Sequence, residues 1–340
     1  MREIICFGEY MLSLQPQGYL RFLQADRFDL FYTGAEANVA ASLAQFGKRA
    51  QLVTRLPEHA IGDAAVASLR KYNIAADHVA RGGERIGVIY TEKGAAQRAS
   101  TVIYDRKNSA LAQAPVDCFD WDTIFQNADW FHFTGITPAL SENTAELCRR
   151  ACAAAKRHHV TISCDLNYRK KLWTTEQAGR TMRELLQYVD VLIANEEDAE
   201  KVLGIRAGNT DVTRGELDRT GYAEVACQIS DTFQIPYVAT TLRKSISASD
   251  NDRSAMLYHN GAVCFSRNYH IHIVNRVGGG DSFAGGLIYA LHEGYEDQRA
   301  LEFAAAASCL KHSIEQDFNL VSVAEVTALM DGDGSGRVQR

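Results

Sequence analysis

The chain has 340 residues, 46% of them hydrophobic, and carries a net charge of −6. This is enough for one large α/β domain, alone or with a small second domain. The acidic balance and the lack of a long basic block argue against a nucleic-acid surface. Since no segment approaches 18 consecutive apolar residues, we expect no membrane span.

The eight cysteines are scattered without a CxxC pair, a usage that fits a reducing cytoplasm. The apolar run at residues 4–7 is too short for a signal peptide. Cys148 and Cys152 lie one helical turn apart, with His158 and His159 just beyond. We interpret this group as a helix face and its C-terminal end rather than as a metal site. The protein is therefore expected to be cytoplasmic.

In chain order, the first irregular regions are residues 10–32 and 86–106, which are rich in β-forming and turn residues and lack a helical period. Within the second region, residues 88–91 and 99–104 flank a Glu-Lys-Gly turn, which predicts an antiparallel hairpin. We predict that both regions form one small β-sheet, a lid over the site. The alternative is that they are edge strands of the main sheet.

Strand-sized apolar runs alternate with helical patterns along most of the remaining chain. The runs are at residues 130–133, 161–164, 189–193 and 237–241, and the helical patterns between them include 141–157 and 175–186. This alternation predicts an α/β fold with a doubly wound, mostly parallel sheet and helices on both faces. The main domain is predicted to comprise residues 1–9, 33–85 and 107–330, followed by a disordered tail at 331–340.

The most informative segment is a glycine-rich turn at residues 277–286, Val-Gly-Gly-Gly-Asp-Ser-Phe-Ala-Gly-Gly. Phe283, Leu287 and Leu291 recur at helical spacing, which predicts a helix packed on the core. A helix N-terminus attracts anions, and glycine lets the backbone approach them closely. Asp281 would repel a resting phosphate, but it suits a base that deprotonates a hydroxyl attacking a phosphoryl group. The alternative for Asp281 is a helix N-cap.

A second motif, Gly-Ala-Glu-Ala-Asn-Val-Ala, occupies residues 34–40. Together with the turn at 278–281, it resembles the paired signatures of the ribokinase-like (PfkB) family of sugar kinases, across nearly the whole chain. The resemblance implies a ribokinase-like fold, ATP as phosphate donor, and Mg²⁺ or another divalent cation. It also implies that Asp281 is the catalytic base and that the amides of Gly278, Gly279 and Gly280 stabilise the phosphoryl group.

The same resemblance assigns further residues by position. Gly34 would let the chain pass close to the sugar, and Asn38 would bond its hydroxyls unless it is a plain helix-surface residue. Glu197 is a candidate metal ligand, directly or through water, or else an acid that complements a helix dipole. The residues aligned with nucleotide contacts are Asn195, Thr241, Arg243, Gly278 and Gly280.

A narrower resemblance links the chain to the 2-keto-3-deoxygluconate kinases. It depends on Arg21-Phe22, on Tyr104-Asp105-Arg106, on the Asp-Leu-Asn-Tyr-Arg string at 165–169, and on the Ser-Ile-Ser-Ala-Ser string at 245–249. In that subfamily the matching residues contact an acid sugar, whose terminal 6-hydroxyl is phosphorylated by ATP. The implied substrate contacts in this chain are Tyr90, Tyr104, Arg106, Asn167 and Arg169.

The chemistry of the two arginines agrees with an acid substrate. A planar guanidinium offers two parallel hydrogen bonds to a carboxylate, whereas a neutral hexose needs no cation. The alternative for Arg106 and Arg169 is a pair of surface ion pairs. The wider alternatives are a neutral-sugar kinase such as a fructokinase, or a catalytically weak sugar sensor. We expect a sugar acid and ATP as ligands, and a homodimer through the lid.

Four positions depart from the family pattern. Asn275 replaces the usual Asp, which puts activation by potassium in doubt, and Gly279 replaces the usual Ala. The segment Arg243-Lys244-Ser245 lacks the glycine-rich nucleotide loop of ribokinases, so the adenine contacts cannot be assigned. Glu315-Gln316 replaces Pro-Gly, which alters the loop near the base.

Overall fold

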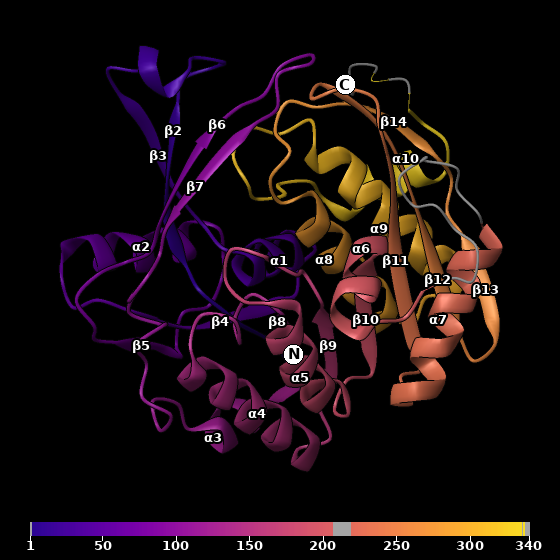
Figure 1. Cartoon of the computed structure of the whole chain (residues 1–340), viewed down its shortest axis with the longest axis horizontal. Helices are drawn as coiled ribbons and strands as arrows, with labels where there is room; N and C mark the ends of the chain where they lie inside the picture. The colour runs from indigo at the N-terminus through magenta and orange to yellow at the C-terminus, as the bar shows by residue number, and fades with distance from the viewer. Residues whose placement is uncertain (1, 207–218, 335, 337–340) are drawn as a thin grey trace.

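The computed structural model describes residues 2–206, 219–334 and 336. These residues form two β-sheets, the larger of which is covered by helices (Figure 1). The larger sheet has ten strands within the described chain: β1 (Glu3–Phe7), β4 (Arg49–Leu56), β5 (Val79–Arg81), β8 (Ala128–Thr134), β9 (Thr161–Asp165), β10 (Val191–Asn195), β11 (Tyr237–Ser245), β12 (Asp250–His259), β13 (Ala262–Phe265) and β14 (Tyr269–His272).

The main sheet is mostly parallel, as predicted. Its order is β13-β12-β11-β10-β9-β8-β1-β4-β5, with β14 paired to β12. The strands from β11 through β10, β9, β8, β1 and β4 to β5 are parallel, and β12 runs antiparallel to β11. The described helices are η1 (Phe22–Gln24), α1 (Ala35–Gln45), α2 (Ala60–Lys71), α3 (Trp121–Phe125), α4 (Glu142–Arg157), α5 (Thr175–Leu186), α6 (Glu196–Asp198), η2 (Ala199–Leu203), α7 (Arg219–Phe233), α8 (Gly279–His292), α9 (Asp297–Lys311) and α10 (Val323–Met330).

Helices bury apolar residues against both faces of this sheet, because successive strand side chains point to opposite faces. In β1, Ile5 and Phe7 pack in one core cluster with α3, α4, α5 and α7. The alternate residues Ile4 and Cys6 pack in a second cluster with α1, α2, α8, α9 and α10. The predicted doubly wound fold is confirmed. It leaves the loops at the strand ends free to build a site.

The smaller sheet is separate from the main one, so the edge-strand alternative is wrong. Its strands are β2 (Met11–Pro16), β3 (Phe28–Thr33), β6 (Val88–Glu92) and β7 (Thr101–Asp105), in the order β3-β2-β6-β7. It projects beyond the helices that cover the main sheet (Figure 1). We call it the lid sheet. The predicted hairpin is present as β6 and β7, although its second strand begins at Thr101 rather than at residue 99.

Helix boundaries follow local capping chemistry. Ser141 precedes α4 and its hydroxyl accepts a hydrogen bond from the Thr144 amide at 3.2 Å, and Thr174 caps α5 in the same way through Gln177. Such caps satisfy amides that have no intrahelical partner. No helix in the described ranges is long and apolar enough to cross a membrane. Of the predicted disordered tail, residues 335 and 337–340 lie outside the described residues.

Candidate active site

A cleft of about 1230 Å³ lies between the lid sheet and the C-terminal ends of β9 and β10. Its wall contains both glycine motifs and the predicted substrate residues of the lid sheet and of the loop after β9. Such a site beyond the strand ends is expected for an open parallel sheet. With one exception, Tyr90, the predicted site residues line this cleft: Gly34, Asn38, Tyr104, Arg106, Asn167, Arg169, Asn195, Glu197, Thr241, Arg243, Gly278, Gly279, Gly280 and Asp281.

The glycine turn at 278–281 forms the N-terminus of α8. Gly278 precedes the helix with a φ of +84°, which favours glycine, and a Cβ there would lie 2.1 Å from the Asp317 carbonyl oxygen. A Cβ on Gly279 would lie 2.3 Å from the His312 ring. The His312 ring therefore explains why glycine replaces the expected alanine at this position. The first-turn amides have no intrahelical carbonyl to bind, so they are available to an anion.

Asp281 and Asn38 join the two glycine motifs. The Asn38 Nδ2 donates to Asp281 Oδ2 at 2.6 Å, although the two residues are 243 positions apart in the chain. Thr33 Oγ1 in turn donates to Asn38 Oδ1 at 3.3 Å. Asn38 is therefore no plain helix-surface residue, because it is buried and orients the Asp281 carboxylate. Asp281 lies in the first turn of α8, and Gly278 rather than Asp281 is the N-cap residue.

The surroundings of Asp281 favour its neutral form. Burial raises the pKa of this carboxyl to about 7, and the negative charges of Glu36 and Asp317 add to the effect. The Asn38 hydrogen bond and the Arg169 charge act in the opposite direction. A carboxyl with a pKa near neutrality can accept and release a proton under ordinary conditions, which is what a general base requires.

Arg106 is buried and already paired, which the sequence did not reveal. Its Nε donates to Glu9 Oε2 at 2.7 Å, Nη2 contacts the same oxygen, and the guanidinium lies over the Tyr104 ring. Glu9 follows β1 and lines the cleft, and its Oε1 is buried with no hydrogen-bond partner among the described residues. The surface ion-pair alternative for Arg106 is wrong, because both side chains of the pair are nearly inaccessible to solvent.

Arg169, the other arginine predicted to contact the substrate, has fewer protein partners than Arg106. Its Nη1 donates to the Tyr168 carbonyl at 3.2 Å, and it forms no ion pair within the described part of the chain. Its charge faces Asp165, Asp198 and Asp281. Burial raises the pKa of Asp165 and raises that of Asp198 to about 6, and the Arg169 charge opposes both shifts. Arg169 thus supplies positive charge beside three acidic side chains of the cleft.

Asn167 completes this wall at the end of β9. It is buried, has a φ of +38°, and its amide donates to Asp165 Oδ1 at 3.1 Å. Asparagine tolerates the left-handed region better than most residues, which suits it to this sharp turn. Gly34 is equally constrained, since a Cβ there would lie 2.1 Å from the Glu9 carbonyl oxygen. Close passage of the chain at Gly34 is therefore a packing requirement of the loop beside β1.

Three of the predicted nucleotide residues lie on the neighbouring strands β10 and β11, where Asn195 and Thr241 are paired in register. Asn195 Oδ1 accepts from the Asp198 amide at 2.9 Å and caps α6. Glu197 is exposed and pairs with Lys201, whose hydrogen bond and charge lower the pKa of Glu197. Thr241 and Arg243 lie on β11, where the segment 243–245 simply continues the strand. That continuation accounts for the missing glycine-rich loop.

Two further arginines line the cleft beside Arg243, and sequence reasoning missed them. Arg253 faces Arg243 across the β11–β12 pair, and its Nε is buried without a hydrogen-bond partner among the described residues. Burial and the charges of Arg243 and Arg276 lower the pKa of Arg253 to about 10. Arg276 donates to the carbonyls of Ser247 and Ala248. Three cations that repel one another favour a polyanionic ligand between them.

Tyr90 lies away from the cleft, contrary to the prediction. Its neighbour Ile89 lines the cleft, so the alternation of β6 turns Tyr90 to the opposite face of the lid sheet. There its ring contacts Phe28 with a centroid distance of 6.4 Å. A contact between Tyr90 and a substrate held in this cleft is therefore not supported.

The altered loop after α9 contacts the lid sheet. Glu315 pairs with Lys93 of the lid hairpin, and Ala96 of the same hairpin binds Ala248 and Ser249. Gln316 has a φ of +62°, a conformation that glycine adopts without strain. Gln316 thus takes a conformation that would suit the glycine of Pro-Gly, and Glu315 adds an ion pair to the lid.

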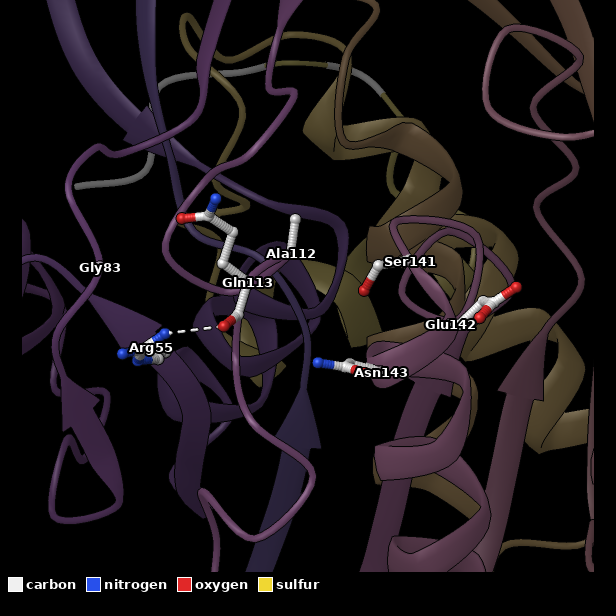
Figure 2. A pocket seen from close by; sticks show the side chains of 7 residues that line it. All are labelled: Arg55, Gly83, Ala112, Gln113, Ser141, Glu142 and Asn143. Carbon is white, nitrogen blue, oxygen red and sulfur yellow. Dashed lines mark hydrogen bonds between the residues drawn. The ribbon is translucent and has the colours of Figure 1, made fainter.

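Two other features lie apart from the cleft. Cys148 and Cys152 are buried on α4 and His158 binds Asp122, so the predicted helix-face interpretation is confirmed. A second hollow of about 660 Å³ is lined by Arg55 and the start of α4 (Figure 2). The Arg55 guanidinium donates to the carbonyl of Ala110 and to that of Gln113 (Figure 2). Both bonds hold the side chain in the protein's own structure.

The fold and the cleft belong to the ribokinase-like class of α/β phosphotransferases, in which a small separate sheet accompanies a mostly parallel main sheet. The chain belongs to the pfkB family of carbohydrate kinases, whose family profile matches residues 1–315. It is therefore a sugar kinase, and membership of this family implies the use of ATP.

Individual relatives cover almost the whole chain. A crystal structure of 2-dehydro-3-deoxygluconokinase from Thermotoga maritima is 49% identical, with a TM-score of 0.94 over 97% of this chain and 98% of that one. The 2-dehydro-3-deoxygalactonokinase of Haloferax volcanii is 30% identical over 98% of both chains. A PfkB family carbohydrate kinase from Listeria grayi is 31% identical, with a TM-score of 0.90 over 97% of this chain and 100% of that one.

Proposed function

We propose that this kinase phosphorylates 2-keto-3-deoxygluconate (2-dehydro-3-deoxygluconate) at its terminal 6-hydroxyl, producing 2-keto-3-deoxy-6-phosphogluconate and ADP. The observation that supports an acid substrate best is Arg169, a cation without an ion pair in the described chain that lines the same cleft as Asp281. A carboxylate would supply its missing partner. The names of the relatives from Thermotoga maritima and Thermoproteus tenax agree with this substrate.

The proposed chemistry is an in-line transfer assisted by Asp281. Its carboxylate takes the proton of the 6-hydroxyl as the sugar oxygen bonds to the γ-phosphorus, and the bond between that phosphorus and the bridging oxygen breaks. The electron pair stays on ADP. First-turn amides of α8 hydrogen-bond the phosphoryl oxygens as charge develops, and removal of one such donor typically costs about 2.7–4 kcal/mol. Positioning and charge neutralisation dominate this type of reaction.

The site also fits a divalent cation on the nucleotide side. Asp198 lines the cleft, is 4% exposed, and its Oδ2 has no hydrogen-bond partner among the described residues. Oxygen donors of this kind suit Mg²⁺. We propose that Asp198 and Glu197 hold the ion, directly or through water. When bound, the ion would neutralise charge on the ATP phosphates.

A second candidate substrate is the galacto epimer, because the Haloferax volcanii relative is named for it. A coupled ADP-release assay with Mg²⁺-ATP would compare 2-keto-3-deoxygluconate, its galacto epimer, fructose and ribose. Turnover of a keto-acid that is lost in Asp281→Asn, and retained in the exposed control Asp120→Asn, would support the proposal. Preference for fructose or ribose would instead identify a neutral-sugar kinase, and absence of all turnover would favour a sugar sensor.

We also propose a homodimer formed through the outer face of the lid sheet. Phe28 and Leu30 are 39% and 53% exposed there, and register places Leu30 in line with Leu14 and Tyr90. Exposed apolar patches of this kind favour association. Light scattering on the wild type and on Leu30→Lys would test the dimer, which the substitution should weaken. The eight cysteines, all free, support a reducing compartment such as the cytoplasm.

A further inference from the structure

Lys311 is a buried cation that the proposed mechanism does not use. It is the last residue of α9 and is 0% exposed. Its Nζ donates to the Ile314 carbonyl at 3.3 Å. Its Cε lies 3.2 Å from the position that a Cβ on Gly278 would occupy. The side chain therefore passes directly behind the turn that begins α8.

The Lys311 ammonium forms no ion pair within the described chain. No carboxylate of the described chain lies within 4.0 Å of its Nζ, whereas Lys48 and Lys93 each have one. The charged groups that face it are Asp317, Asp281 and Glu315, which attract it, and Lys93, which repels it. Burial lowers the pKa of Lys311 to about 8, against the opposing effect of Asp317 and Asp281.

A buried ammonium without a close counter-charge is costly, so its retention needs an explanation. Asp317 is itself 1% exposed, and its carbonyl oxygen lies against Gly278 on the same turn. Asn275, which stands where the family often has a carboxylate, adds no charge and donates to Asp317 Oδ1 at 3.5 Å. Without Lys311, Asp317 would lose the larger of the two lysine charges that oppose its own behind the anion-binding amides, the other being that of Lys93.

We propose that Lys311 is a positioning residue for phosphoryl transfer, a built-in cation behind the Gly278 turn that balances Asp317 and Asp281. It fixes the turn from the side opposite the cleft and keeps the potential at the α8 amides favourable to an anion. Its charge attracts the Asp281 carboxylate, so it favours the ionised form of Asp281, as Arg169 and Asn38 do. The inference rests on the phosphoryl transfer proposed above, not on the identity of the sugar.

The test uses Lys311→Met, which keeps the length and volume of the side chain, and Lys311→Ala, which leaves room for a small amine. Lys48→Met is the matched control, because Lys48 is a mostly buried lysine that pairs with Glu293 far from the cleft. Turnover is measured as the ratio of variant to wild type on whichever sugar the wild type phosphorylates. Failure of the proposed substrate therefore leaves this comparison intact.

We expect Lys311→Met to lower kcat about 10- to 100-fold, less than loss of a direct anion-hole donor, with little change in KM for the sugar. The acid limb of its pH profile should move to higher pH, because Asp281 loses a favourable charge. Methylammonium should raise the kcat of Lys311→Ala in a saturable way and leave Lys48→Met unchanged.

The proposal is overturned if folded Lys311→Met keeps its kcat within twofold and its acid limb in place. It is also overturned if folded Lys311→Ala loses activity that no small amine restores. Where both variants fail to fold, the wild-type profile decides. The proposal requires kcat to fall as Lys311 loses its proton above about pH 8, and an undiminished kcat up to pH 10 contradicts it.

Discussion

The substitution Arg169→Met is the sharpest test of carboxylate recognition, because Arg169 forms no ion pair in the described chain, whereas Arg106 is paired with Glu9. Removing Arg106 would leave the Glu9 carboxylate buried without its partner. Breaking a buried pair in this way costs about 3–5 kcal/mol of stability. Lost activity in Arg106→Met would therefore confuse unfolding with lost binding. Arg169 has no such partner in the described chain, so its removal leaves no buried carboxylate without an ion-pair partner.

The expected loss of kcat/KM in Arg169→Met follows from the guanidinium N–H donors that no protein group accepts. One Arg169 nitrogen already donates to the Tyr168 carbonyl, and the other donors of its guanidinium are available to a ligand in the cleft. A hydrogen bond to a charged group contributes about 1.5–3 kcal/mol. Loss of that contribution corresponds to a fall of about 10- to 150-fold in kcat/KM.

The assay compares two substrates that differ only in the group recognised. One is 2-keto-3-deoxygluconate, and the other is the neutral ketose in which a hydroxymethyl group replaces the carboxylate. Arg169→Met should lose kcat/KM on the acid and retain it on the neutral ketose. Each variant is measured at its own pH optimum, because removing Arg169 also raises the pKa of Asp281. Arg157→Met, at an exposed pair with Asp122, is the control.

An equal loss on both substrates would refute the carboxylate argument and assign Arg169 to the support of Asp281 alone. An unchanged kcat/KM on the acid would refute both roles. The selective loss is the only outcome that requires a guanidinium–carboxylate contact.

Asp281→Asn should lower kcat about 10²–10⁴-fold. The same substitution should raise the melting temperature at pH 8. Folding raises the pKa of the Asp281 carboxyl from 3.8 to about 7, so the ionised carboxylate destabilises the folded state above pH 7. A lower melting temperature in calorimetry would contradict this expectation. In the wild type, kcat should fall as pH drops below about 7, and a profile flat to pH 5 would exclude Asp281 as the base. Gly279→Ala should cost about 1–3 kcal/mol by overpacking against His312, and a thermal-unfolding cycle should show that His312→Ala recovers part of that loss. Finally, exchanging sodium for potassium should leave kcat unchanged because Lys311 supplies the local charge, and a tenfold activation by potassium would argue otherwise.

Local patterns were sufficient for the architecture, whereas most residues of the cleft were assigned by the resemblance to the ribokinase-like family. Helical spacing and strand-sized runs are properties of neighbouring residues, so α4, α5 and β8 to β11 could be predicted from the sequence. The glycine turn was recognisable because its conformation restricts which residues can occupy it. Tyr90 was misplaced since Ile89 and Tyr90 are both apolar, and alternation then does not say which one faces the cleft.

The missed residues act through tertiary contacts that no local pattern encodes. Glu9 and Arg106 are 97 positions apart, and their pairing exists only once the lid sheet is placed on the main sheet. Arg253 lies beside Arg243 because β11 pairs with β12, and Arg276 comes near both from the segment that leads into α8. Lys311 has the sequence context of an ordinary helix C-terminus, where a cation complements the dipole. Its burial follows from the packing of α9 on α8.

The charges of the cleft are distributed in the direction that the reaction needs. Acids surround the sugar hydroxyl side, where the charge of Arg169 faces Asp281 and Asp165. Arginines 243, 253 and 276 repel one another on the nucleotide side and have no ion pair among the described residues. During transfer a proton leaves the hydroxyl and negative charge moves toward ADP. A proton-accepting wall at one end and a cationic wall at the other favour both movements.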